Sequence, residues 1–101
     1  MHFNSFVNVR IMTKTEQALV SQIYDLVTVI PGFASFDQTS QEPVVVQPLA
    51  PNKVSITMMI TIKRNVAAPT VAKHIFESIN LACQANHQIL GQLHLEIKGV
   101  N

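Results

Sequence analysis

The sequence feature that most constrains the fold is a long alternation of side chains in the segment Val54–Lys63. Apolar residues occupy every second position, and polar residues occupy nearly all of the positions between them. The apolar residues are Val54, Ile56, Met58, Ile60 and Ile62. Successive side chains of a β-strand point to opposite faces, so this pattern predicts a strand with one face buried in a core. Met59 interrupts the polar series and is expected to emerge on the opposite face.

Shorter stretches of the chain carry the same signature of β-structure. Phe6–Met12 and Leu90–Lys98 alternate apolar and polar residues, which predicts two strands half-buried against a core. Phe33–Phe36 and Val44–Val46 are short apolar runs. Prolines on both sides of the second run are typical of an edge strand, because proline cannot donate to a central ladder. The polar residues 37–43 between the two runs predict a loop.

A first amphipathic helix is predicted to begin at Thr13. Thr13 and Glu16 have the spacing of a capping box, in which each side chain bonds to the backbone N–H of the other residue. Pro31-Gly32 is expected to end this helix, because proline lacks an N–H and glycine tolerates positive φ. Apolar residues recur mostly three and four positions apart and predict one buried face. They are Leu19, Ile23, Leu26, Val27 and Ile30.

A second amphipathic helix is predicted from near Pro69 to near Asn86-His87. Proline suits the first helical turn, where its missing N–H has no partner in any case. Asn65 precedes this helix and is expected to adopt the left-handed conformation of a turn. The predicted apolar stripe is wide. It consists of Val71, Ala72, Ile75, Phe76, Ile79, Ala82 and Cys83.

These elements predict a single domain that spans residues 1–101. The expected fold class is α+β, with the element order β-α-β-β-α-β. Two amphipathic helices would cover one face of a mostly antiparallel or mixed sheet of about four to five strands, as in other two-layer sandwiches.

The charge content indicates a surface suited to association. Charged residues make up 13% of the chain, about half of the usual ~25%. A surface poor in charge is weakly protected against self-association, so we expect a homo-oligomer or a bound partner. The net charge is +1, and no basic stripe is present, which argues against nucleic acid as a partner.

The residues that could carry chemistry do not form a recognisable site. The four histidines, His2, His74, His87 and His94, lack the spacing of a helical zinc site, which leaves only a site assembled from distant residues. Cys83 is the only cysteine and falls on an apolar stripe, so we expect an inert thiol. The six acidic residues are scattered. We therefore expect no catalytic residue, no cofactor and no metal, in a protein that is not an enzyme.

A candidate interaction surface lies around the apolar residue on the polar face of the long strand. It comprises Met59, Thr57, Thr61, Lys63 and Arg64. An exposed thioether suits an adaptable contact surface. The alternatives are that a loop covers Met59 and that Lys63 and Arg64 are simply the solvated end of a strand.

The pattern of strands and turns resembles the alkaline shock protein family, the general stress proteins of Gram-positive bacteria, which includes the YloU-like proteins. The resemblance rests on the alternation Val54–Lys63, followed by Asn65-Val66, Pro69–Ala72 and the closing Leu93–Val100. Upstream, Ile30–Phe33 is similar to the segment that follows the family's first helix. Asn65 stands where the family often has glycine, and Asn86-His87 replaces its usual Thr-Gly.

The resemblance implies a small cytoplasmic protein, associated with the cell envelope through a membrane-anchored partner. No catalytic residues carry over. No apolar run approaches the ~20 residues of a membrane span, and Met1–Arg10 do not have the pattern of a signal peptide. We therefore expect a non-enzymatic stress- or envelope-associated scaffold protein that self-associates. The alternatives are an RNA- or ribosome-associated α+β module and a small-ligand-binding regulatory domain.

Overall fold

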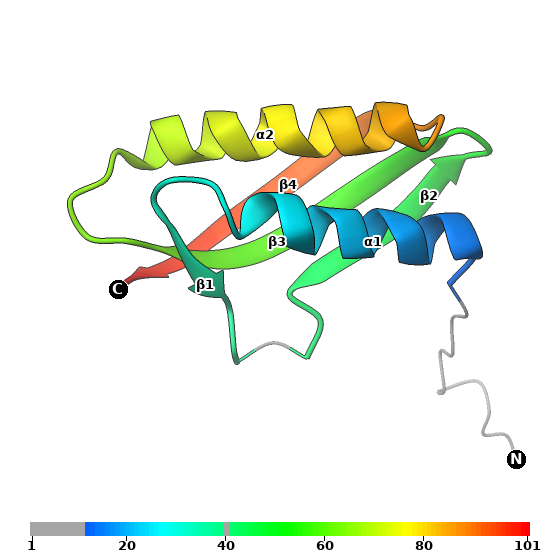
Figure 1. Cartoon of the computed structure of the whole chain (residues 1–101). Coiled ribbons are helices and arrows are strands. Elements are labelled where there is room, and N and C mark those ends of the chain that lie inside the picture. Colours follow the sequence, from blue (N-terminus) through cyan, green and yellow to red (C-terminus); the bar gives the residue numbers. More distant parts are fainter. Residues whose placement is uncertain (1–11, 40) are drawn as a thin grey trace, which may run out of the picture.

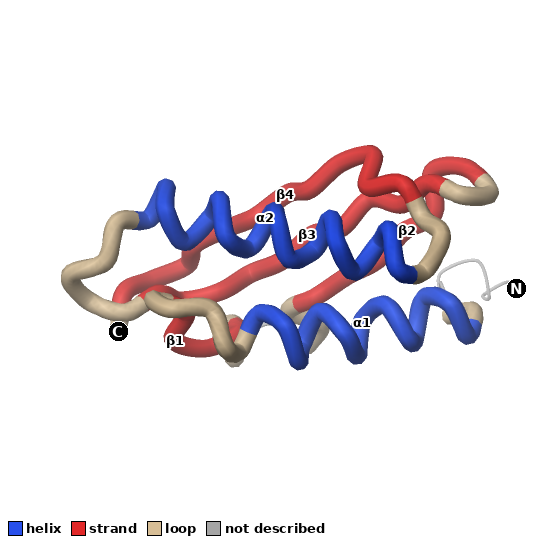
Figure 2. Tube along the Cα trace, turned by 45° about the horizontal axis from the view of Figure 1, so that its top comes forward, coloured by secondary structure: helices blue, strands red, loops and turns tan. Residues whose placement is uncertain are grey.

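The computed structural model describes residues 12–39 and 41–101, which form an α+β sandwich of two layers. Helices α1 and α2 run antiparallel to each other and cover the same face of one sheet (Figures 1 and 2). The predicted fold class and the placement of both helices on one face are confirmed. In chain order the elements are α1 (Lys14–Val27), β1 (Phe33–Phe36), β2 (Val44–Ala50), β3 (Lys53–Ile62), α2 (Ala68–Ala85) and β4 (Ile89–Val100).

The strand predicted at Phe6–Met12 lies outside the described residues, apart from Met12, which is not in a strand. The described chain therefore has three strands between its helices and one strand after them.

Strand β3 is the centre of a mixed sheet. It pairs in parallel with β4 on one side and antiparallel with both β1 and β2 on the other. Strand β1 opposes the last part of β3, where Phe36 pairs with Ile60, and β2 opposes the first part, where Val44 pairs with Met58. Strands β1 and β2 are thus two halves of one interrupted edge, and the loop 37–43 leaves the sheet between them.

The alternation of the long strand is confirmed by its burial. All five apolar residues from Val54 to Ile62 are buried, whereas the residues between them are half-buried on the other face. The buried face of β3 meets the apolar faces of both helices, because strands and helices each expose one apolar side. The largest fully buried side chains are Leu19, Ile23, Ile56, Met58, Ile60, Ile75, Ile79, Val27, Val46 and Cys83.

Helix α1 begins as predicted but ends earlier. The Thr13 hydroxyl accepts from the Glu16 N–H at 3.1 Å, and the Glu16 carboxylate accepts from the Thr13 N–H at 2.9 Å, which completes the capping box. The helix ends at Val27 rather than at Pro31-Gly32, and turns carry the chain on to β1. Gly32 has φ +92, and a Cβ there would lie 2.7 Å from a methyl of Val71. The glycine therefore permits the chain to pass close to α2.

The apolar faces of the two helices are narrower than the sequence indicates. Leu26, predicted to be buried, is 38% exposed, and Phe76 is half exposed. Both residues lie at the margin of their helix's apolar stripe, where the neighbouring layer does not reach. The remaining members of the α1 stripe are buried, including Ile30 beyond the helix end.

The turns around α2 match their prediction. Asn65 has φ 64, the left-handed value expected before the helix, and Pro69 stands in the first turn. After the helix, His87 adopts φ 58. The Asn86 side chain donates to the Ala82 carbonyl at 2.8 Å and to the Gln22 amide oxygen at 2.9 Å, which links the end of α2 to α1.

Two strands are longer than predicted. Strand β2 continues past Val46 to Ala50 and includes Pro48, and β4 continues past Lys98 to Val100. Pro48 is tolerated because β2 is an edge strand, whose outward positions need no ladder bond. Both extensions follow the length of β3, which supplies pairing partners beyond the limits of the apolar pattern.

Candidate interaction surfaces

The face of the sheet opposite the helices is open across the described part of the chain (Figure 2). Its central row consists of the half-buried side chains of β3, namely Ser55, Thr57, Met59 and Thr61. Strand β4 contributes a second row through the register of Thr57 with His94 and Met59 with Glu96. The open face is therefore rich in hydroxyl groups and carries a thioether at its centre.

The structure brings together part of the interaction surface predicted from the sequence. Thr57, Met59 and Thr61 share the open face, as their alternation requires. Lys63 and Arg64 follow the strand end and are exposed. The Lys63 N–H donates to the Gly32 carbonyl at 2.8 Å, and the Arg64 N–H donates to the Asn101 carbonyl at 3.1 Å. These bonds fix the backbone from which the two basic side chains extend beside the open face.

Met59 also marks the point at which the edge opposite β4 is interrupted. Its N–H donates to the Pro43 carbonyl and its carbonyl accepts from the Asp37 N–H, both at 2.9 Å. The two ends of the loop 37–43 therefore satisfy the backbone of Met59 where no strand residue faces it. The Met59 side chain is half-buried on the open face.

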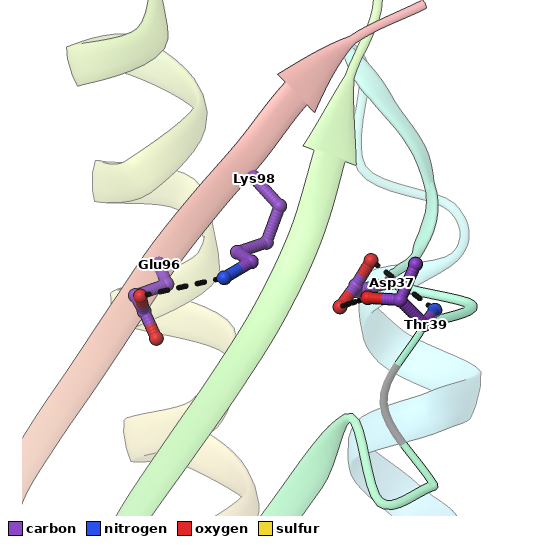
Figure 3. Close-up of polar contacts among 4 residues, drawn as sticks. All are labelled: Asp37, Thr39, Glu96 and Lys98. Carbon is purple, nitrogen blue, oxygen red and sulfur yellow. Dashed lines mark hydrogen bonds and ion pairs between the residues drawn. The ribbon is translucent and has the colours of Figure 1, made fainter.

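Polar contacts fix the surroundings of this face. The Ser35 and Thr61 hydroxyl oxygens lie 2.7 Å apart across β1 and β3. The buried Asp37 carboxylate accepts from the Thr39 hydroxyl at 2.7 Å and from its N–H at 3.4 Å, which closes the start of the loop (Figure 3).

Glu96 and Lys98 form a loose pair on β4, with 3.9 Å between the Glu96 carboxylate and the Lys98 ammonium (Figure 3). Both side chains are more than two-fifths exposed, so this contact contributes little to stability.

The outer edge of β4 is the surface that sequence reasoning missed. Strand β4 pairs with β3 alone among the described strands, and it runs along the side of the sheet (Figure 1). Ile89, Ile97 and Val100 are 60%, 37% and 61% exposed. The available signal was the alternation of Leu93, Leu95 and Ile97, but alternation indicates a face and not whether a strand is central or at an edge.

Two hollows lie beside α1. One, of about 500 Å³, separates the start of α1 from the β2–β3 turn and is lined mainly by apolar residues such as Leu19, Pro48 and Leu49, with Glu16 among the polar ones. The other, of about 680 Å³, follows the outer edge of β2, where Val20 and other α1 side chains face β2. Each hollow is widely open to solvent.

The remaining titratable side chains do not assemble into a chemical centre within residues 12–39 and 41–101. No group of three or more metal-ligating side chains occurs there. His74, His87 and His94 are exposed. Cys83 is fully buried, and burial raises the pKa of its thiol, which keeps it in the unreactive protonated form.

The described helices include none with the length and apolar content needed to cross a membrane. Comparisons of the chain with models of protein families, with curated proteins and with solved structures find no match.

Proposed function

We propose that this chain is a non-enzymatic interaction or scaffold protein, associated with stress or with the cell envelope, that self-associates. The proposed biological setting derives from the resemblance to the alkaline shock protein family described above. The proposed mode of action derives from the surface. Binding would use uncharged sheet surfaces, and recruitment to the envelope would use a membrane-anchored partner from the cytoplasm.

The observation that supports this proposal most directly is the amount of apolar side chain left on the surface. Scattered exposed apolar residues are normal in monomers, but a group on one element indicates an interaction site. Three of the exposed residues here lie on β4 alone. Within residues 12–39 and 41–101 the exposed large apolar residues are Leu26, Val29, Leu49, Phe76, Leu81, Ile89, Ile97 and Val100.

The open face adds an adaptable polar surface. Thr57 and Thr61 hydroxyls can each donate and accept hydrogen bonds, so they can match partners of either kind. Met59 between them is flexible and polarisable, which suits contact with irregular apolar surfaces. Lys63 and Arg64 would supply the positive charge at one end of this surface.

Light scattering coupled to gel filtration, over a range of protein and salt concentrations, tests the proposal. We expect an oligomer that grows with protein concentration and is insensitive to salt, because apolar burial is not screened by ions. A strict monomer at every concentration would contradict self-association. Fractionation of the native cell tests the envelope: the protein should sediment with membranes and should be released when the anchored partner is removed.

The hollow at the start of α1 favours one second candidate function, the binding of a small apolar ligand. Its volume of about 500 Å³ lies within the usual range of ligand sites, and Leu19, Leu49 and Val54 line it. Thermal denaturation in the presence of lipids and metabolites tests this function. A ligand of this hollow should raise the melting temperature of the wild-type protein and not that of Leu49→Arg, which would fill the opening.

A further inference from the structure

Strand β4 is an edge with little of the usual protection against pairing. It spans 12 residues, and no described residue bonds to its outer side. Edge strands in monomers are commonly short, or are interrupted by proline, bulges or inward-pointing charges. Strand β4 contains no proline, and its two charged residues, Glu96 and Lys98, point to the open face. Its register with β3 shifts near Gly91 and near Lys98 and is regular between them. The backbone of this regular stretch is therefore available to another strand.

The register identifies which residues face that other strand. Met59 of β3 and Lys63, which directly follows the strand, bond toward the β1–β2 side, so the alternate residues of β3 bond toward β4. His94 and Glu96, paired with Thr57 and Met59, therefore turn their N–H and C=O groups to β3. The N–H and C=O groups of Leu93, Leu95 and Ile97 consequently point outward.

The sequence of β4 is self-complementary about Leu95. The match covers residues 93–97, which lie between the register shifts near Gly91 and Lys98. If a second copy lies antiparallel with Leu95 opposite Leu95, Leu93 opposes Ile97 on the helix side of the sheet. On the open face His94 opposes the Glu96 carboxylate.

We propose that two copies of this chain pair antiparallel through β4 about a twofold axis at Leu95, which joins their sheets into one continuous sheet. The proposal rests on the self-association proposed above and names the surface that carries it. The outward groups at Leu93, Leu95 and Ile97 all find partners in this register. The Leu95 N–H of each copy donates to the Leu95 carbonyl of the other, because the axis passes between them.

The pairing also accounts for the apolar side chains that β4 leaves exposed. Leu93 and Leu95 are half-buried and Ile97 is 37% exposed, although all three point toward the helix side of the sheet. In the paired state Ile97 lies beside Leu93 of the second copy. Apolar cross-strand neighbours stabilise a sheet, so each copy completes the burial of the other.

A single cysteine at the axis tests the register. In Leu95→Cys the two Cα atoms would lie about 5.5 Å apart, within the range of a disulfide of about 4.4–6.8 Å. The matched control is Leu93→Cys, whose two copies would lie at least about 13 Å apart along the strands. We expect mild oxidation to link Leu95→Cys into a dimer and to leave Leu93→Cys unlinked. The native Cys83 is buried and does not compete.

A charge on the edge tests the interface independently of the disulfide. Ile97→Lys places a lysine among the apolar residues of the interface, as natural proteins do to block an edge. We expect the dimer dissociation constant to rise tenfold or more. Val29→Lys makes a similar change at an exposed apolar position between α1 and β1 and should leave the constant unchanged. Circular dichroism checks that both variants are folded.

The outcomes separate this proposal from the function on which it rests. An oligomer that survives Ile97→Lys and is not linked by Leu95→Cys would overturn the β4 interface and leave the scaffold function standing. Loss of the dimer in Ile97→Lys with linkage at position 93 instead of 95 would overturn the axis. A strictly monomeric wild-type protein would overturn both proposals. If the protein is a monomer and the outward N–H groups of Leu93, Leu95 and Ile97 are nevertheless protected from hydrogen exchange, another segment of the same chain pairs with this edge.

Discussion

The two edges of the sheet differ in how well their backbone groups are protected from pairing with another chain. The edge formed by β1 and β2 is broken by the loop 37–43, contains Pro48 and is followed closely by α1. The β4 edge runs from Ile89 to Val100, contains no proline, and keeps a regular register with β3 between the shifts near Gly91 and Lys98. The loop and the proline are known obstacles to pairing with another chain, and β4 has neither of them. The difference indicates that one edge is closed and the other is available.

The interruption of the first edge is stabilised locally. Asp37 and Pro43 supply the bonds that Met59 would otherwise lack, and Thr39 binds the Asp37 carboxylate. The loop can therefore leave the sheet without an unsatisfied backbone group at the centre of β3. The β4 edge has no comparable device among the described residues, so its outward groups are satisfied by solvent or by a second strand.

The largest expected effect comes from β3, on which both edges depend. Ile60 is fully buried and pairs with Phe36 on one side and with Ile97 on the other. Ile60→Ala should lower the free energy of unfolding by about 2–5 kcal/mol, because it removes buried methyl groups and leaves a cavity. Urea denaturation measures this loss. The exposed Leu49→Ala should change stability by less than about 0.5 kcal/mol, and an equal loss in both variants would contradict the assigned core.

An intermediate effect should be confined to the closed edge. Asp37 is buried, and its carboxylate holds Thr39, so Asp37→Ala should lower the free energy of unfolding by about 1–2 kcal/mol. Self-association should be unchanged, because the loop lies on the side of β3 opposite β4. Denaturation and light scattering on the same variant check both statements, with Gln38→Ala as the control in the same loop. A weaker oligomer in Asp37→Ala would mean that the closed edge takes part in assembly.

The smallest effect should appear at the open face of the β4 edge. Glu96→Lys would replace the carboxylate that faces His94 of the second copy by an ammonium group. The twofold axis repeats this contact twice, and cross-strand pairs contribute about 0.2–1 kcal/mol each, so we expect the dissociation constant to rise about two- to thirtyfold. The double variant His94→Glu with Glu96→Lys places opposite charges across the axis again and should lower the constant at least to the wild-type value.

The matched control for this charge change is Glu77→Lys, which alters an exposed residue of α2. Sedimentation at several concentrations measures the dissociation constants. Equal effects of Glu96→Lys and Glu77→Lys would show that only net charge matters, and would remove the support for an axis at Leu95.

Local sequence signals were sufficient for the identity and the beginnings of the elements. The alternation around Met58, the capping box of Thr13 and Glu16, and the turn at Asn65 depend on residues close together in the chain, and the structure confirms each of them. The same alternation placed Thr57, Met59 and Thr61 together on the open face, because the period of a strand fixes which side chains share a face. This part of the candidate surface was therefore accessible from the sequence.

Only the tertiary structure decided which strands are neighbours and where the elements stop. Helix α1 ends at Val27, and β4 extends to Val100, because packing partners and pairing partners from distant segments set those limits. The alternation of Leu93, Leu95 and Ile97 is the same for a central strand as for an edge. Their outward backbone groups became visible only when the register with β3 was known. Periodicity records the face of a residue, whereas pairing depends on contacts between residues far apart in the chain.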